Sequence, residues 1–201
     1  MKTKWLIKST GRELFNTEGV MNVTLRDIAS KLQRSYGNIT YYYGTKEVLI
    51  NELFDDMHQE LNELQEISRD QNLLSYLLKL PEVSFEITRK YVFFTVDHNE
   101  LKRNFPLFFT RMNELHNNRK AQWLGILNRL LAEGYLKSDL SEGDLQYIMF
   151  LSGCVRTAYF QLMDAAAYDQ RDYLQTVNAL LKPYLSKQGL GLYKLYLNSE
   201  L

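Results

Sequence analysis

Residues 24–46, with the sequence TLRDIASKLQRSYGNITYYYGTK, have the pattern of two short helices joined by a tight turn. Thr24 is followed three residues later by Asp27, and this is the spacing of a capping box at the start of a helix. Ser35 is placed to cap the second helix, which Gly44 then ends. The apolar residues of the first helix recur at helical spacing and predict one buried face: Ile28, Ala29 and Leu32.

The second helix carries mostly hydrogen-bonding side chains, and Ile39 is its one aliphatic anchor. A helix this short and this polar is poorly suited to packing alone. A helix, a short turn and a second helix with exposed polar side chains is the helix-turn-helix pattern, whose second helix enters the major groove of DNA.

The expected DNA contacts follow from this pattern, because Arg pairs best with guanine, Asn with adenine, and helix starts meet phosphates. The residues predicted to contact DNA are Thr24, Arg34, Ser35, Tyr36, Gly37, Asn38, Tyr41, Tyr42 and Lys46.

The same residues resemble a known family. The motifs T-x-R-D-I-A, S-x-G-N, Y-Y and T-K-E, within an ungapped match from roughly Leu14 to Leu53, are similar to those of the TetR family of bacterial repressors. The family usually has small residues in the turn, where this chain has Leu32, Gln33 and Arg34. The resemblance implies a repressor with an N-terminal DNA-binding module and a helical body that dimerises and binds an effector. The competing interpretation is an all-α ligand-binding or enzymatic scaffold that does not bind DNA.

Charge is distributed unevenly along a chain of 201 residues whose formal net charge is zero. Residues 1–50 hold eight Lys/Arg and four Asp/Glu, a balance of +4, and the remaining residues hold 16 and 20, a balance of −4. A basic first quarter on an acidic body supports a DNA-facing head, although the contrast is modest.

The fold class predicted for the whole chain is all-α, because apolar positions recur at helical spacing and no long alternating segment indicates a sheet. The expected domains are a helix-turn-helix domain (1–46), a connecting helix (47–67) and a helical effector-binding and dimerisation domain (68–201). Pro81 is expected to end a short helix that begins at Leu73. The tail 189–201 is too apolar to lie free in water, but its docking site cannot be predicted.

The segment from Tyr147 to Val155 is apolar on nearly every side, so the helix that contains it is expected to be buried all round. Such a helix would face the core on one side and a second subunit on the other, and the TetR resemblance implies this kind of dimer. The alternative is a central core helix of a monomer. The residues expected at the dimer interface are Leu151, Gly153, Val155, Tyr159, Val177 and Leu181.

Many aromatic residues lie between Tyr91 and Phe160, and aromatic-lined pockets are typical small-molecule sites. The family resemblance implies an effector site among these helices, for a largely apolar or aromatic ligand. The residues expected to line it are Tyr91, Phe94, Phe109, Met112, Trp123, Tyr147 and Phe150. The long helix after Thr45 would connect this site mechanically to the DNA head. An open alternative is a constitutive regulator whose body only dimerises.

No motif in the chain indicates catalysis or a bound cofactor or metal. The three histidines are scattered, and the single cysteine, Cys154, excludes an intramolecular disulfide. No signal peptide follows the N-terminal lysines, and the longest uncharged stretch is far shorter than a membrane span, so a cytoplasmic location is expected. The sequence thus predicts a homodimeric, sequence-specific DNA-binding repressor that a small molecule releases from a palindromic operator.

Overall fold

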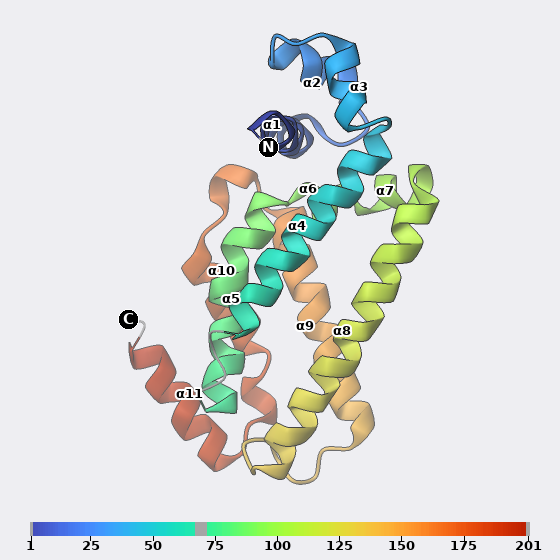
Figure 1. Ribbon diagram of the computed structural model, residues 1–201. Helices are drawn as coiled ribbons and strands as arrows, with labels where there is room; N and C mark the ends of the chain where they lie inside the picture. Colours follow the sequence, from blue (N-terminus) through green and yellow to red (C-terminus); the bar gives the residue numbers. More distant parts are fainter. Residues whose placement is uncertain (1, 67–71, 200–201) are drawn as a thin grey trace. The chain divides into compact units, whose positions relative to one another are not determined.

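The computed structural model describes residues 2–66 and 72–199, and these consist of helices and their connections (Figure 1). In chain order the helices are α1 (Lys2–Glu18), α2 (Leu25–Lys31), α3 (Tyr36–Tyr42), α4 (Lys46–Glu66), α5 (Leu73–Lys90), α6 (Phe93–Val96), α7 (His98–Asn104), α8 (Pro106–Ala132), α9 (Glu142–Leu162), η1 (Ala165–Ala167), α10 (Gln170–Ala179), η2 (Lys182–Tyr184) and α11 (Lys187–Ser199). The described residues form no strand beyond an isolated bridge between Leu136 and Leu185, which confirms the all-α prediction.

The chain separates into two compact units, unit 1 (Met1–Asn62 and Ile87–Asn113) and unit 2 (Glu63–Glu86 and Glu114–Leu201). Most of α4 therefore belongs with the helix-turn-helix, and so do α6, α7 and the start of α8. The boundary predicted at residues 67 and 68 lies outside the described residues. None of the described helices has the length and apolar character that crossing a membrane requires.

Local capping signals set several helix starts. Thr24 and Asp27 form a complete capping box before α2, and Ser141 and Asp144 form another before α9. The Asp169 side chain accepts a hydrogen bond from the Asp172 amide at the start of α10. These starts depend on contacts within four residues, which explains why the sequence alone reveals them.

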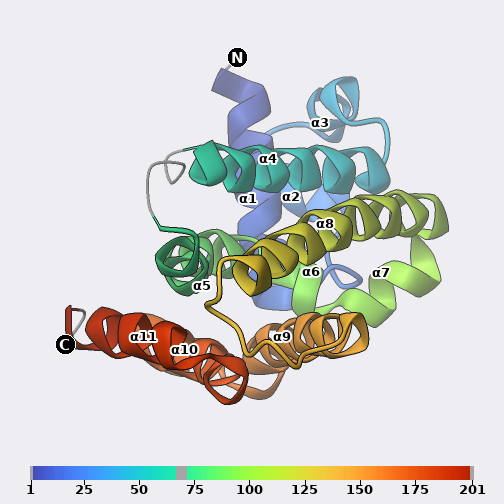
Figure 2. The same ribbon diagram turned by 90° about the horizontal axis from the view of Figure 1, so that it is seen from below.

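Unit 1 is built around the crossing of α1 and α4 (Figure 2). A Cβ atom placed on Gly11 would lie 2.9 Å from the Leu49 side chain, so the two helices approach closely there. The side chains that fill this core are fully or almost fully buried: Ile7, Phe15, Ile28, Leu49, Leu53 and Phe54. Burial of side chains of this size contributes roughly 1.5–3 kcal/mol each, which makes the crossing a strong anchor.

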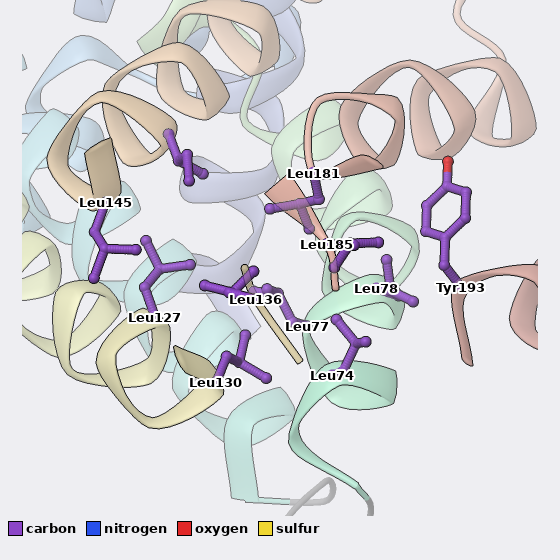
Figure 3. Packing of buried hydrophobic residues seen from close by; sticks show 11 residues of the cluster. Leu74, Leu77, Leu78, Leu127, Leu130, Leu136, Leu145, Leu181, Leu185 and Tyr193 are labelled. Carbon is purple, nitrogen blue, oxygen red and sulfur yellow. The ribbon is translucent and has the colours of Figure 1, made fainter. Parts of the chain in front are cut away.

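Unit 2 has a separate core of aliphatic side chains from α5, α8, α9 and α11 and from the segments that connect them (Figure 3). Its central members are Leu74, Leu77, Leu78, Leu127, Leu130, Leu136, Leu145, Ile148, Leu181, Leu185 and Tyr193. An aromatic cluster lies elsewhere in unit 2, where Phe85 stands 5.6 Å from Phe160 and 5.3 Å from Tyr173 between ring centroids.

The prediction that a helix ends before Pro81 is wrong, because α5 continues through this proline to Lys90. Proline inside a helix removes one backbone hydrogen bond and costs about 3 kcal/mol. The α5 side chains Leu74, Leu78 and Phe85 lie on both sides of the proline and are almost fully buried. The buried Asn178 side chain also donates to the carbonyl of Leu78, at 2.8 Å. Long-range packing therefore outweighs the local penalty.

The C-terminal helix α11, whose docking site the sequence could not reveal, is fixed to the loop after α8. The Ser186 hydroxyl donates to the Gly134 carbonyl at 2.6 Å, and the Ser186 amide donates to the Tyr135 carbonyl at 3.0 Å. A Cβ atom on Gly189 would lie 2.2 Å from the same Tyr135 oxygen, so only glycine permits this approach.

The two α11 glycines give a direct test of this docking. We expect Gly189→Ala to lower the free energy of unfolding by about 1–3 kcal/mol, because the new methyl group overlaps a backbone oxygen. Gly191→Ala is the matched control, since a Cβ atom there meets nothing within 4 Å, and it should raise stability by about 0.5–1 kcal/mol. Urea unfolding measures both, and equal stability of the two variants would contradict the docking.

Candidate nucleic-acid interface

The α2–α3 pair forms the surface that the sequence predicts to face DNA. The Thr24 amide donates to the Asp27 carboxylate at 2.7 Å, and the hydrogen bond from the Thr24 hydroxyl lowers the pKa of Asp27. The Ser35 hydroxyl accepts from the Asn38 amide at 3.2 Å and caps α3. Both hydroxyls, which were expected to contact DNA, therefore also hold the helix starts.

The turn between the two helices depends on an unusual backbone conformation at Gln33, whose φ is 54°. This left-handed region is uncommon for residues other than glycine. The Arg34 amide donates to the Ala29 carbonyl at 2.9 Å, and the Gln33 amide donates to Ser30 at 3.0 Å. Backbone hydrogen bonds therefore close the turn, although it lacks the small residues that are usual at these positions in the TetR family.

Two buried side chains, Ile39 and Tyr43, anchor α3 to the rest of unit 1. Burial raises the pKa of Tyr43, whose hydroxyl donates to Glu52 on α4 at 2.9 Å. On the other side of the helix, Tyr41 is 82% exposed and Tyr36 is 46% exposed. The anchors therefore turn one side of α3 to solvent, as a DNA-reading helix requires.

The predicted contact residues differ in what they can offer to DNA. Arg34 and Gly37 are exposed. Tyr42 is exposed and meets Tyr41 edge to face, at 5.1 Å between ring centroids. Asn38 is half-buried, and its side-chain oxygen is buried without a hydrogen-bond partner. In this rotamer that oxygen cannot accept a hydrogen bond from adenine.

Lys46, which was expected to contact phosphate, has a structural role in unit 1. Its ammonium group donates to the carbonyls of Val20 and Val23, at 2.7 and 2.9 Å, and burial lowers its pKa. It therefore fixes the loop between α1 and α2. An ammonium group has three donors, so a phosphate contact through the third stays a prediction.

Arg26 is a candidate DNA contact that the sequence reasoning missed. It is exposed on α2, and its guanidinium lies 5.2 Å from the centroid of the Tyr36 ring on α3. Stacking on an aromatic ring orients the planar donor fork of arginine, which suits contact with guanine or phosphate. The sequence signal that could have identified Arg26 is its position in the T-x-R-D motif.

Three basic residues of α1 make contacts within unit 1. Lys4 pairs with Glu52 and Lys8 pairs with Asp56, each at 2.6 Å, and Arg12 lies 5.1 Å from the centroid of the Tyr91 ring. The spacing of four residues on both helices aligns these partners along α1 and α4. The positive charge of the first fifty residues is therefore divided between this ladder and the α2–α3 surface.

The segment 87–113 packs against α1 and the loop that leads from α1 to the helix-turn-helix. The Val20 amide donates to the Asp97 carboxylate at 2.6 Å, and burial raises the pKa of Asp97. The Asn16 side chain donates to the Lys90 carbonyl at 2.9 Å and accepts from the Phe93 amide at 3.2 Å. Aromatic contacts complete the packing, with the Phe15 and Phe93 ring centroids 5.2 Å apart. We call these contacts the rear clasp.

The residues expected to line a ligand pocket belong to different units. Tyr91, Phe94, Phe109 and Met112 belong to unit 1, and all except the half-buried Phe109 are buried. Trp123, Tyr147 and Phe150 belong to unit 2. Tyr147 is 54% exposed and Phe150 is 64% exposed, so these two side chains do not belong to the core of unit 2.

The expected dimer-interface residues also divide into two groups. Gly153 is exposed, and Leu151 and Val155 are half-buried. Tyr159, Val177 and Leu181 are buried within unit 2 and leave almost no surface for a second copy. Within a single chain the helix α9 is therefore not buried all round, since one face carries the exposed residues Tyr147, Phe150, Gly153 and Cys154.

Together, the capped α2–α3 pair and the exposed face of α3 define a helix-turn-helix protein. The family model for bacterial regulatory proteins of the tetR family matches residues 7–53, which contain this pair. A comparison with curated proteins gave no match.

Solved structures extend the similarity over nearly the whole chain. A TetR-family transcriptional regulator from Marinobacter aquaeolei VT8 is 25% identical, with a TM-score of 0.82, over 98% of this chain and 99% of that one. The ketosteroid transcriptional regulator KstR2 of Mycobacterium tuberculosis shares the fold at 16% identity and a TM-score of 0.72, over 92% and 96% of the two chains. The fatty acid degradation regulator FadR from Bacillus halodurans shares it at 17% identity and 0.71, over 89% and 93%.

Residues 7–53 therefore match the DNA-binding region of the TetR family, and the whole chain is similar in fold to DNA-binding transcriptional regulators of that family. Regulators of this family bind operator DNA, dimerise and bind small-molecule effectors.

The different surroundings of the basic residues predict which of them contribute to DNA binding. We expect Arg34→Ala to flatten the slope of log affinity against log salt by about one per half-site, because an exposed cation beside α3 is lost. Lys8→Ala is the matched control and should leave the slope unchanged, since Lys8 pairs with Asp56. Titrations of operator binding at several salt concentrations measure the slopes. A Lys8→Ala slope as flat as that of Arg34→Ala would contradict this division.

Proposed function

We propose that this protein is a homodimeric repressor that acts in the cytoplasm on a pseudo-palindromic operator and that a small-molecule effector releases it. The observation that carries the proposal is the exposed face of α3, which the buried Ile39 and Tyr43 hold outward. Two such helices in a symmetric dimer would reach successive major-groove faces about 34–36 Å apart, or a multiple of that distance. A gel shift with the DNA that flanks its own gene tests the proposal, and failure to bind any DNA specifically would contradict it.

The exposed face of α9 supports the dimer. Tyr147 and Phe150 lie one turn apart there, with Gly153 and Cys154 one turn further. Large apolar side chains on a solvent-facing helix, next to a glycine that permits close approach, are typical of an interface between subunits. We assign the dimer contact to this face and no longer to the buried Tyr159, Val177 and Leu181.

A matched pair of glycine variants tests the dimer. Gly153→Arg should give folded monomers that bind operator weakly, because a charged side chain would enter the interface while a Cβ atom meets nothing within 4 Å in the chain itself. Gly191→Arg is the control, since Gly191 is also exposed and unobstructed, on α11. Light scattering at micromolar concentration measures the mass. A monomeric wild-type protein, or a dimeric Gly153→Arg variant, would contradict the assignment.

A largely apolar or aromatic effector is the ligand that the aromatic content of unit 2 favours. Phe85, Phe160 and Tyr173 form a cluster there. In the same unit, Arg156 lies 5.9 Å from the Trp123 ring centroid and also donates to the Ser152 hydroxyl, at 3.3 Å. Aromatic walls with a few polar groups suit such ligands. The rival interpretation is a constitutive regulator whose body only dimerises.

Reciprocal titrations distinguish an inducible regulator from a constitutive one. A ligand that releases operator must bind more weakly when operator is present, by the same factor, and typical couplings are about 5–150-fold. In a Trp5→Phe variant, Trp123 is the single remaining tryptophan and can report binding by fluorescence. Each candidate ligand is titrated with operator, without it, and with unrelated DNA as the control. Equal affinities would show that the ligand is not the inducer.

A further inference from the structure

The outward face of α3 carries no charged side chain that could contact the edges of DNA bases. Neither its first nor its last turn holds an acidic or basic residue, and its sequence is YGNITYY. Gly37 and Tyr41 lie one turn apart on this face, with Thr40 beside them. Arginine, lysine and glutamine, which make many of the specific contacts to base edges, are missing from the helix.

Two of the side-chain polar groups on α3 are also bonded within the helix or buried. The Thr40 hydroxyl lies within hydrogen-bond distance of the carbonyls of Tyr36 and Gly37, at 3.2 and 3.3 Å. The side-chain oxygen of Asn38 is buried. The groups around Gly37 are therefore a threonine methyl group, the exposed Tyr41 ring with its hydroxyl, and bare backbone.

Gly37 has no role in the fold that requires glycine. Its φ is not positive, since Gly19 and Gly134 are the glycines with positive φ among the described residues. A Cβ atom placed on it would meet nothing within 4 Å. Glycine weakens a helix relative to alanine, so a glycine in the first turn of so short a helix needs another reason. Close approach of the backbone to a ligand is such a reason.

We propose that α3 recognises thymine, by packing Gly37, the Thr40 methyl group and the Tyr41 ring against C5-methyl groups in the major groove. Thymine is the one DNA base that presents a methyl group in this groove, and apolar side chains distinguish it by contact with that group. The bare backbone at Gly37 brings the helix close enough for this contact. The inference rests on the proposed function, since it specifies the operator that the repressor would select.

The test begins with an operator that the full-length protein selects from random duplex DNA. Each thymine of a half-site is then replaced singly by uracil, which removes the methyl group and preserves base pairing. Loss of one contacted methyl group should weaken binding about fourfold. The same replacement in a non-selected duplex is the control and should change nothing, because binding there depends on phosphates.

A pair of glycine variants separates the role in binding from any role in folding. Gly37→Ala should leave the protein at least as stable as the wild type but bind the selected operator at least tenfold more weakly. Gly125→Ala, at an exposed glycine of α8 whose Cβ atom would also meet nothing within 4 Å, should keep full affinity.

The possible failures are distinguishable. If no sequence is selected, the proposed function fails, and this inference fails with it. If an operator is selected but its half-sites contain no thymine, or uracil versions bind equally well, or Gly37→Ala binds like the wild type, thymine recognition is overturned and the proposed function stands.

Discussion

The DNA-reading surface depends on one physical constraint: α2 and α3 have seven residues each, and helices of this length are not stable in isolation. Their caps help, but a cap contributes only about 1 kcal/mol. The remaining stability must come from burial of Ile28 and Ile39, and of Tyr43 directly after α3, in the core of unit 1. The orientation of the reading face is therefore decided by residues that cannot touch DNA.

This constraint changes the expected mechanics of the regulator. The sequence suggested that α4 is a lever between head and body, but residues of α4 up to Asn62 lie in the same compact unit as α1, α2 and α3. The ion-pair ladder connects α1 to α4, and the rear clasp connects the helix-turn-helix to residues 87–113. A structural change at Asp97 or Asn16 would therefore act on the whole of unit 1. If the protein is regulated by an effector, we expect unit 1 to move as a body without bending of α4 within it.

Sequence reasoning succeeded where structure depends on near neighbours and was incomplete where it depends on distant ones. The capping boxes at Thr24 and Ser141 were predictable because each involves residues three positions apart. The continuation of α5 through Pro81 and the burial of the Lys46 ammonium group depend on contacts distant in the sequence. Hydrophobicity alone could not reveal that Phe150 is exposed while Tyr159 is buried, since this depends on which face of α9 the core covers.

Native-state hydrogen exchange can show whether the helix-turn-helix and residues 87–113 form one cooperative body. The amides of Val20, Tyr43 and Phe93 donate to Asp97, Ile39 and Asn16 respectively, so they report on both segments. All three amides should open with the same free energy, and Asp97→Ala, which removes the acceptor of the Val20 amide itself, should lower the opening free energy equally for Tyr43 and Phe93. Opening of Tyr43 at a much lower free energy than Phe93, or a loss of protection confined to one segment in Asp97→Ala, would contradict this expectation.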